Sequence, residues 1–255
     1  MDETYQDYIN RVARQTLPAS HSTQLKSIQS SPKFVEGKPA SFPGYTIITP
    51  LKNKDSVNRD FYSHLETLQQ KLLQNTDSGL LIALPPETFH VTLVDLIWEN
   101  AYNHAVEEDI NFEQELRKEI QVIFEQYQQA ISPAKSIAWQ LLGLVIRPRA
   151  IAACLVPKDR ESYEAIIQLR RSIYQNQKLM SLGIEQQYDY TAHVTLAYFG
   201  EIINNSDRLS NIISEISEQL METEDQILTI HQAQLHKFDN MVHYYREPDW
   251  AVIKF

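Results

Sequence analysis

The sequence predicts an α+β fold of two similar lobes, because one order of strands and helices can be read twice along it. Apolar residues at three- and four-residue spacing indicate the helices, and short apolar runs indicate the strands. A chain of 255 residues, 43% hydrophobic and 22% charged, can bury a sizeable core and has an ordinary globular composition. We expect a bilobal, pseudo-symmetric duplication, in which each lobe has an antiparallel-rich sheet with helices on its outer face and a groove lies between the lobes.

The two passes contain the same five elements. The first comprises a strand at 45–51, a helix at about 56–74, a strand through 88–98, a helix at about 107–130 and a strand at about 137–147. The second comprises a strand at 150–157, a helix at about 159–177, a strand at 188–199, a helix at about 206–222 and a strand at about 226–238. A final stretch, 241–255, again has strand character.

The N-terminal residues are expected to lie outside the repeat. Residues 2–15 show the pattern of an amphipathic helix, and the Ser-, Gln- and Lys-rich residues 16–36 indicate a loop or extended arm. We therefore divide the chain into an N-terminal helix and linker, 1–36, and one bilobal domain, 37–255, whose lobes at about 37–147 and 148–255 can exchange strands.

The formal net charge of −10 argues against a long nucleic acid as partner, because such binding relies on many Lys and Arg contacts to phosphates. A small nucleotide or the end of an RNA fits this charge better. The six glycines form neither a Gly-x-Gly-x-x-Gly nor a Gly-Lys-Ser/Thr motif, and Gly-x-Ser-x-Gly does not occur. Dinucleotide-binding, P-loop and serine-hydrolase chemistry therefore have no support. No obligate protein partner is evident.

Several features predict a cytoplasmic protein without membrane association. No apolar run reaches membrane-spanning length, and the acidic, polar N-terminus does not resemble a secretory signal. The one cysteine, Cys154, lies in the apolar run 151–156 and has no second cysteine for a disulfide. We expect a buried, inert thiol.

Each middle strand of the repeat carries the same tetrapeptide, His-Val-Thr-Leu, at 90–93 and at 193–196. Side chains two positions apart in a strand point to the same face, so the histidine and threonine of each copy share one face. The valine and leucine share the other face and can pack under helices, which leaves the polar face to line the groove. The stretch 21–23 also fits His-x-Thr, but no apolar residues flank it, and we set it aside.

Two imidazoles that face one groove suit phosphoryl transfer at a ribose. One neutral histidine can take a proton from the attacking oxygen while the other, protonated, gives one to the leaving oxygen, and the ordinary His pKa of about 6.5 makes both forms accessible. Threonine hydroxyls can donate to the non-bridging phosphate oxygens. This chemistry needs no metal and no cofactor. We assign His90 and His193 as the catalytic pair and Thr92 and Thr195 as phosphate-binding residues.

Paired His-x-Thr motifs on two pseudo-symmetric lobes resemble the signature of the 2H phosphoesterase superfamily, which includes RNA 2′,3′-cyclic phosphodiesterases and 2′-5′ RNA ligase-like proteins. The resemblance covers about residues 37–255, and the segment 37–46 looks like the opening of an uncharacterised bacterial branch. It implies cyclic phosphodiesterase-like activity on a small nucleotide or an RNA end, with the four motif residues in the roles given above. Some members use a tyrosine five residues after the second histidine, and Tyr198 stands there.

Three further residues are candidates for substrate binding. Tyr198 lies at odd spacing from the second motif histidine, so it needs a β-bulge or the strand's end to reach the groove, and a core tyrosine is the alternative. Tyr45 can stack on a base or pack in the core. Arg147, at the end of a central strand, can meet a phosphate or form an exposed ion pair. Asp95 lies at odd spacing from the first motif histidine, which predicts that its carboxylate points away from the groove.

Two other classes of function stay open. A metal-dependent hydrolase finds no support in the sequence, because it has no His-x-x-x-His with an acid, no Cys cluster and no paired Asp at ligand spacing. A non-catalytic nucleotide- or RNA-end-binding module would keep the groove without the chemistry, and the presence of both histidines and both threonines counts against it. Insensitivity to a chelator excludes the first, and turnover of a 2′,3′-cyclic nucleotide excludes the second.

Overall fold

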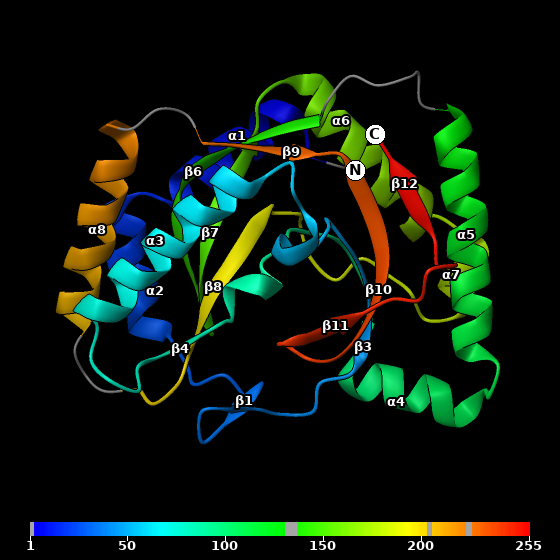
Figure 1. The fold of residues 1–255 in the computed structure, drawn as a ribbon, viewed down its shortest axis with the longest axis horizontal. Helices are drawn as coiled ribbons and strands as arrows, with labels where there is room; N and C mark the ends of the chain where they lie inside the picture. The colour runs from blue at the N-terminus through cyan, green and yellow to red at the C-terminus, as the bar shows by residue number, and fades with distance from the viewer. Residues whose placement is uncertain (1–2, 131–136, 203–205, 223–225) are drawn as a thin grey trace.

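A computed structural model describes residues 3–130, 137–202, 206–222 and 226–255, which form two five-stranded antiparallel sheets flanked by helices (Figure 1). The first sheet has the order β11-β10-β3-β5, with β12 also paired to β10; its strands are β3 (Gly44–Ile48), β5 (Thr92–Trp98), β10 (Gln232–Asn240), β11 (His243–Tyr245) and β12 (Val252–Lys254). The second has the order β4-β8-β7-β6-β9; its strands are β4 (Leu81–Ala83), β6 (Ile137–Arg147), β7 (Ala150–Pro157), β8 (His193–Phe199) and β9 (Ile227–Ile230). The predicted bilobal α+β fold is confirmed.

The two repeated units exchange their last strands. In each unit the first two strands pair with each other, β3 with β5 and β7 with β8. The third strand of the first unit, β6, pairs with β7, and β10 of the second unit pairs with β3. Each sheet is therefore completed by the other half of the chain, so neither half of the sequence contains a complete sheet.

Helices cover the outer sides of the sheets. Helices α2 (Pro18–Gln24), α3 (Arg59–Asn75) and α8 (Ser206–Glu222) lie together at one end of the molecule, and α4 (Glu99–Glu108), α5 (Phe112–Ala130) and α7 (Gln177–Ser181) lie at the other (Figure 1). Helices α1 (Tyr5–Gln15) and α6 (Arg160–Tyr174) pack on β6 and β7. The stripe of α3 expected from its spacing, Phe61, Leu65, Leu68 and Leu72, is at most 3% exposed, as an amphipathic helix on a core requires.

The central strand β7 accounts for Cys154. Seven of the eight β7 residues are buried, because β6 and β8 flank this strand and helices cover it. Cys154 is fully buried, and burial raises the pKa of its thiol to about 12. The expectation of a buried thiol is confirmed, and the thiolate form that would make it reactive is strongly disfavoured.

The N-terminal residues are more ordered than their composition indicated. Residues 16–36 contain α2, the 3₁₀ turn η1 (Leu25–Ser27) and strand β1 (Phe34–Val35), which pairs with β2 (Lys38–Pro39), so the expectation of a loop or extended arm is wrong. His21 on α2 is fully buried, with Nε2 2.9 Å from the Leu144 carbonyl oxygen. Tertiary burial outweighs the weak helix propensity of this polar stretch. The division of the chain at residue 36 stays a prediction.

Other differences concern element boundaries. The helix expected at about 107–130 is two helices, α4 and α5, and β4 and α7 lie in segments with no expected element. The strand expected at about 226–238 is divided at His231 into β9 and β10, which belong to different sheets. Two short 3₁₀ turns, η2 (Lys52–Lys54) and η3 (Pro86–Thr88), contact each other, and η3 ends just before the first motif.

Candidate active site

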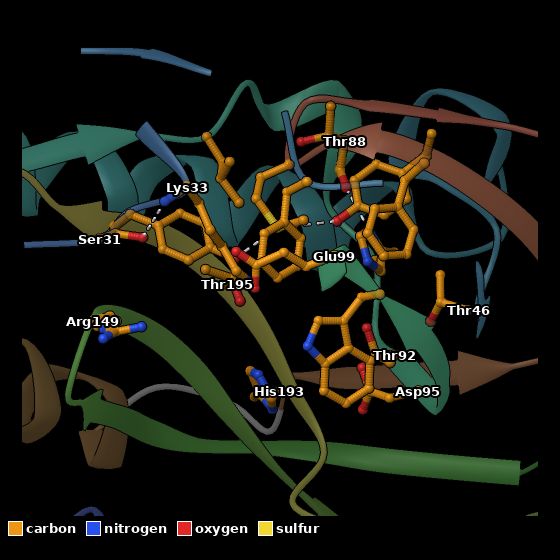
Figure 2. A pocket seen from close by; sticks show the side chains of 18 of the residues that line it. Ser31, Lys33, Thr46, Thr88, Thr92, Asp95, Glu99, Arg149, His193 and Thr195 are labelled. Atoms are coloured by element: carbon orange, nitrogen blue, oxygen red, sulfur yellow. Dashed lines mark hydrogen bonds between the residues drawn. The ribbon is translucent and has the colours of Figure 1, made fainter. Parts of the chain in front are cut away.

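A cavity of about 440 Å³ lies between the two sheets, and all four motif residues line it (Figure 2). The first sheet contributes His90 just before β5 and Thr92 at its start, and the second contributes His193 and Thr195 of β8. Because β5 and β8 are the second strands of the two units, the repeat brings the two copies of the tetrapeptide to opposite walls of one space. The expected groove between the lobes is present.

Both imidazoles are held in the same way. The Nδ1 atom of His90 lies 2.7 Å from the Thr88 carbonyl oxygen, and Nδ1 of His193 lies 2.7 Å from the Thr191 carbonyl oxygen. A carbonyl oxygen only accepts hydrogen bonds, so Nδ1 carries the proton in each neutral ring and Nε2 is left as the acceptor. Each neutral ring therefore has Nε2 as its hydrogen-bond acceptor.

Burial lowers the pKa of both histidines to about 4, but their neighbours differ. After burial, the Thr88 carbonyl raises the pKa of His90, His193 lowers it and the Asp95 carboxylate raises it. For His193, Arg147 lowers the pKa, the Thr191 carbonyl raises it and Lys33 lowers it. Both rings are therefore neutral near pH 7, and they differ in their charged neighbours: Asp95 acts on His90, whereas Arg147 and Lys33 act on His193.

A β-bulge turns Tyr198 into the cavity. Ala152 of β7 pairs with Thr195 and Ile151 pairs with Ala197, so Leu196 is the extra residue of β8. A bulge shifts the alternation of side chains by one position, which places Tyr198 on the wall that carries the second histidine. Tyr198 lines the cavity and is 9% exposed, and its hydroxyl lies 3.2 Å from Sδ of Met241. The bulge that this residue needs is present.

The first motif has a matching bulge, and here the expectation for Asp95 is wrong. Ile48 of β3 pairs with Thr92 and Ile47 pairs with Val94, so the extra residue of β5 is Leu93. Leu93 is the fourth residue of the first tetrapeptide, and Leu196 is the fourth residue of the second. Asp95 therefore lines the cavity instead of pointing away from it. Its carboxylate accepts a hydrogen bond from the hydroxyl of Tyr188.

Buried side chains from helices satisfy the carbonyl groups of both bulged residues. Arg170 of α6 donates from Nη1 to the Leu93 carbonyl at 2.7 Å. Gln69 of α3 donates from Nε2 to the carbonyls of Leu196 at 2.8 Å and Leu84 at 2.7 Å, and the Leu196 carbonyl also accepts from the Leu84 amide at 3.0 Å. Gln69 and Arg170 are each 4% exposed. Buried carbonyls need hydrogen-bond donors, and at the second bulge Gln69 also satisfies the neighbouring Leu84 carbonyl, so the two side chains stabilise the bulges that shape the cavity.

The other two candidates for substrate binding are placed differently from Tyr198. Tyr45 borders the cavity, but its side chain is fully buried, its hydroxyl accepts a hydrogen bond from Arg117 at 2.8 Å, and its ring packs on Tyr102 and Trp250. Core packing, the alternative for Tyr45, describes this environment. Arg147 is the last residue of β6 and does not line the cavity. Arg149, in the two-residue turn that follows, lines the cavity instead.

Residues before the repeat also reach the site, and the sequence carried no signal for them. Ser31 and Lys33 line the cavity. Their segment is held in place by a hydrogen bond from the Ser31 amide to the Phe199 carbonyl at 2.8 Å, at the end of β8. Contacts between residues so far apart in the chain are decided by the tertiary fold and leave no local pattern.

Within the described ranges, no three His, Cys, Asp or Glu side chains are grouped so that they could hold a metal ion. Asp95 is the carboxylate nearest the motif in sequence, and its described partner is the hydroxyl of Tyr188. Across the same ranges, none of the helices is both long enough and apolar enough to span a membrane.

Two lobes with paired His-x-Thr motifs facing one cavity define the architecture of 2H phosphoesterases and RNA ligase-like proteins. Residues 33–132 match the family model described as "2H-phosphodiest: Domain of unknown function (DUF1868)", so this part of the chain is similar to that family. The matched residues include the first motif and Lys33 but end before the second motif. Comparison with curated proteins gives no match.

Comparison with solved structures gives matches at low sequence identity. ATU0111, a conserved protein of unknown function from Agrobacterium tumefaciens, is 14% identical with a TM-score of 0.58, over 86% of this chain and 92% of its own. TT0787 of Thermus thermophilus is 14% identical with a TM-score of 0.49, over 82% and 94%. LigT of E. coli, complexed with 3′-AMP, is 10% identical with a TM-score of 0.43, over 84% and 95%. ATU0111 supports the shared fold, and at these identities no activity is transferred.

Proposed function

We propose that this protein is a metal-independent phosphoesterase that opens the cyclic phosphate of a 2′,3′-cyclic nucleotide or RNA end by two-histidine acid/base catalysis. The observation that carries the proposal is the equivalent setting of His90 and His193 in one cavity, each with Nδ1 held by a carbonyl and Nε2 available. A structural histidine does not require a second copy, in the same orientation, on the opposite wall.

The charges around the two rings suggest how the roles are divided in hydrolysis. Arg147 and Lys33 favour neutral His193, which suits the base that takes a proton from the attacking water. Asp95 favours protonated His90, which suits the acid that gives its proton to the leaving ribose oxygen. The water oxygen forms a bond to phosphorus, the ester bond to the ribose breaks, and one proton enters at His193 as another leaves His90.

The two threonines would bind the phosphate. Thr92 and Thr195 are partly buried, line the cavity, and lie two residues after their histidines. Their hydroxyls can donate to the non-bridging oxygens, which carry the negative charge of the phosphodiester and gain charge in the transition state. Because one threonine comes from each wall, the pair would hold the phosphorus between the two imidazoles.

Turnover of a 2′,3′-cyclic mononucleotide, followed by phosphorus NMR in the presence of a chelator, tests the proposal. We expect activity that survives chelation and falls about 10²–10⁴-fold in His90→Ala and in His193→Ala. The double variant should lose little more than the worse single one, because the pair acts as a unit. His104→Ala is the matched control, since its side chain is 68% exposed on α4. Near-normal rates in either active-site variant would refute the acid/base assignment, and chelator-sensitive activity restored by a divalent ion would favour the metallohydrolase.

A further inference from the structure

The cavity has a basic end that the two-histidine chemistry does not use. Figure 2 shows Ser31, Lys33 and Arg149 on one side of the view, with Thr46, Thr92 and Asp95 on the other. We propose that Lys33 and Arg149 form a second anion subsite, which binds a phosphate group other than the reacting one. The proposal rests on the function proposed above and assigns its substrate class: a 2′,3′-cyclic phosphate end that carries at least one further phosphate.

Lys33 places a cation in the cavity without a carboxylate partner. Its Nζ lies 4.4 Å from the ring centroid of Phe42 and 5.4 Å from that of Tyr198, so two aromatic faces enclose the ammonium group. In the part of the chain that the structure describes, Lys33 forms no ion pair. Burial lowers the pKa of Lys33 to about 8 although the carboxylates of Asp95 and Glu99, which form no ion pair with it, raise it, so a bound anion in contact with the ammonium would stabilise its charged form further.

Arg149 brings a second cation to the same end. It lies in the turn between β6 and β7, where the Gln29 amide donates to the Pro148 carbonyl at 2.7 Å and the Phe199 amide donates to the Arg149 carbonyl at 3.0 Å. The turn is thus fixed by backbone hydrogen bonds, while its guanidinium forms no ion pair with any described residue. Arg149 lowers the pKa of Lys33, so the two like charges repel each other. An anion between them would replace this repulsion with two attractions.

The size and polarity of the cavity determine where a second phosphate fits. A volume of about 440 Å³ far exceeds the roughly 30 Å³ share of one water molecule, so it has room beyond a single phosphate group. The side of the view opposite Lys33 carries the carboxylate of Asp95, which would repel a phosphate (Figure 2). With the cyclic phosphate between the histidines, the additional phosphate points toward Lys33. It is either a 5′-phosphate on the same nucleotide or the phosphodiester to the preceding one.

Three substrates test the proposal: adenosine 2′,3′-cyclic phosphate, its 5′-phosphorylated form, and the dinucleotide ApA with a 2′,3′-cyclic end. We expect an added phosphate to increase kcat/KM by about 10- to 200-fold, the range of charge-assisted hydrogen bonds. The larger increase identifies the source of the second phosphate. In Lys33→Met and Arg149→Met, the ratio of kcat/KM with the added phosphate to kcat/KM without it should fall toward one. Lys38→Met, an exposed lysine of β2, is the matched control and should keep both the rates and this ratio.

Binding measured by calorimetry separates the two proposals. If no substrate turns over but the 5′-phosphorylated nucleotide binds at least tenfold more tightly than the unphosphorylated one, and Lys33→Met removes that difference, the function fails and the subsite stands. If all three substrates turn over with equal kcat/KM in the wild-type protein, the function stands and the subsite is overturned. Should Lys33→Met fail to fold, Arg149→Met provides the same comparison, since Arg149 is exposed on a turn.

Discussion

Asp95 and Tyr198 occupy equivalent positions on opposite walls of the cavity, each five residues after a motif histidine. Both reach the cavity because a bulge falls at the fourth residue of each tetrapeptide, Leu93 or Leu196. The repeat therefore extends beyond the four shared residues, while the side chains at this fifth position differ. A carboxylate lines the cavity on one wall and a phenol on the other, which makes a symmetric framework chemically asymmetric.

The bulges should depend on the buried donors that satisfy them. Gln69→Leu removes the hydrogen bonds to the Leu196 and Leu84 carbonyls, and we expect the free energy of unfolding in urea to fall by about 1–3 kcal/mol. At urea concentrations where this variant stays folded, kcat/KM should fall about tenfold, because Tyr198 is no longer held in the cavity.

Gln128→Leu is the control for this loss. Gln128 also bonds a backbone carbonyl, that of Lys254, but it is exposed on α5 and water can replace it. Its stability loss should be smaller and its kcat/KM unchanged. A folded Gln69→Leu protein with full kcat/KM would show that the bulge does not need this donor. Arg170→Met provides the same test for the Leu93 bulge.

The threonines should contribute to the rate without setting its pH dependence. Thr92→Val and Thr195→Val keep the shape of the side chain and remove one hydrogen bond to a charged phosphate. We expect kcat/KM to fall by about 10- to 200-fold in each, at about tenfold per 1.36 kcal/mol. Thr67→Val is the control, because its exposed hydroxyl donates within α3 to the Ser63 carbonyl. Unchanged kcat/KM in either motif variant contradicts the assignment of that threonine.

The pH dependence of kcat/KM should differ from that of kcat. Both histidines have a pKa of about 4 in the free protein, whereas the mechanism needs one of them protonated. A bound phosphate anion favours the imidazolium and raises its pKa. Because kcat/KM reports the free protein and kcat the complex, kcat/KM should decline between about pH 5 and 8 while kcat peaks at a higher pH. Superimposable profiles would show that phosphate does not raise either pKa.

Buried neutral histidines should make the fold less stable in acid. Burial lowers the pKa of His90 and His193 to about 4 and that of His236 to about 3, against about 6.5 in the unfolded chain. The unfolded chain therefore binds more protons between these values. The stabilisation is complete above pH 6.5 and is lost as the pH falls toward 4, by at most about 1.4 kcal/mol per pH unit for each histidine.

Urea denaturation at pH 7, 6 and 5 measures how steeply the free energy of unfolding changes with pH. His236→Gln should reduce this pH dependence by the equivalent of about one proton taken up on unfolding. His104→Gln, on the exposed face of α4, should leave the pH dependence unchanged. An equal slope in His236→Gln and the wild-type protein would mean that His236 titrates alike in the folded and unfolded states.

The sequence predicted the two-lobed fold but not its strand exchange. Apolar spacing along the chain is a local property, and it indicated the repeated order of elements correctly. Which strand completes which sheet depends on pairing between distant segments, so the positions of β6 and β10 were decided by the tertiary structure. The polar helix α2 was missed for the same reason, since its burial comes from contacts with β6 and α8.

The repeated tetrapeptide alone was enough to predict that His90, Thr92, His193 and Thr195 share one space, because the period of a strand determines which side chains lie on one face. The remainder of the site depends on structure that has no local pattern. Asp95 was placed on the wrong face because a bulge breaks that period, and the bulge is stabilised by a side chain 77 residues away in the sequence. Lys33 and Arg149 line the same cavity only because the chain before the repeat packs against the end of β8. The low pKa of each histidine likewise arises from desolvation, which requires that the two lobes close around the cavity.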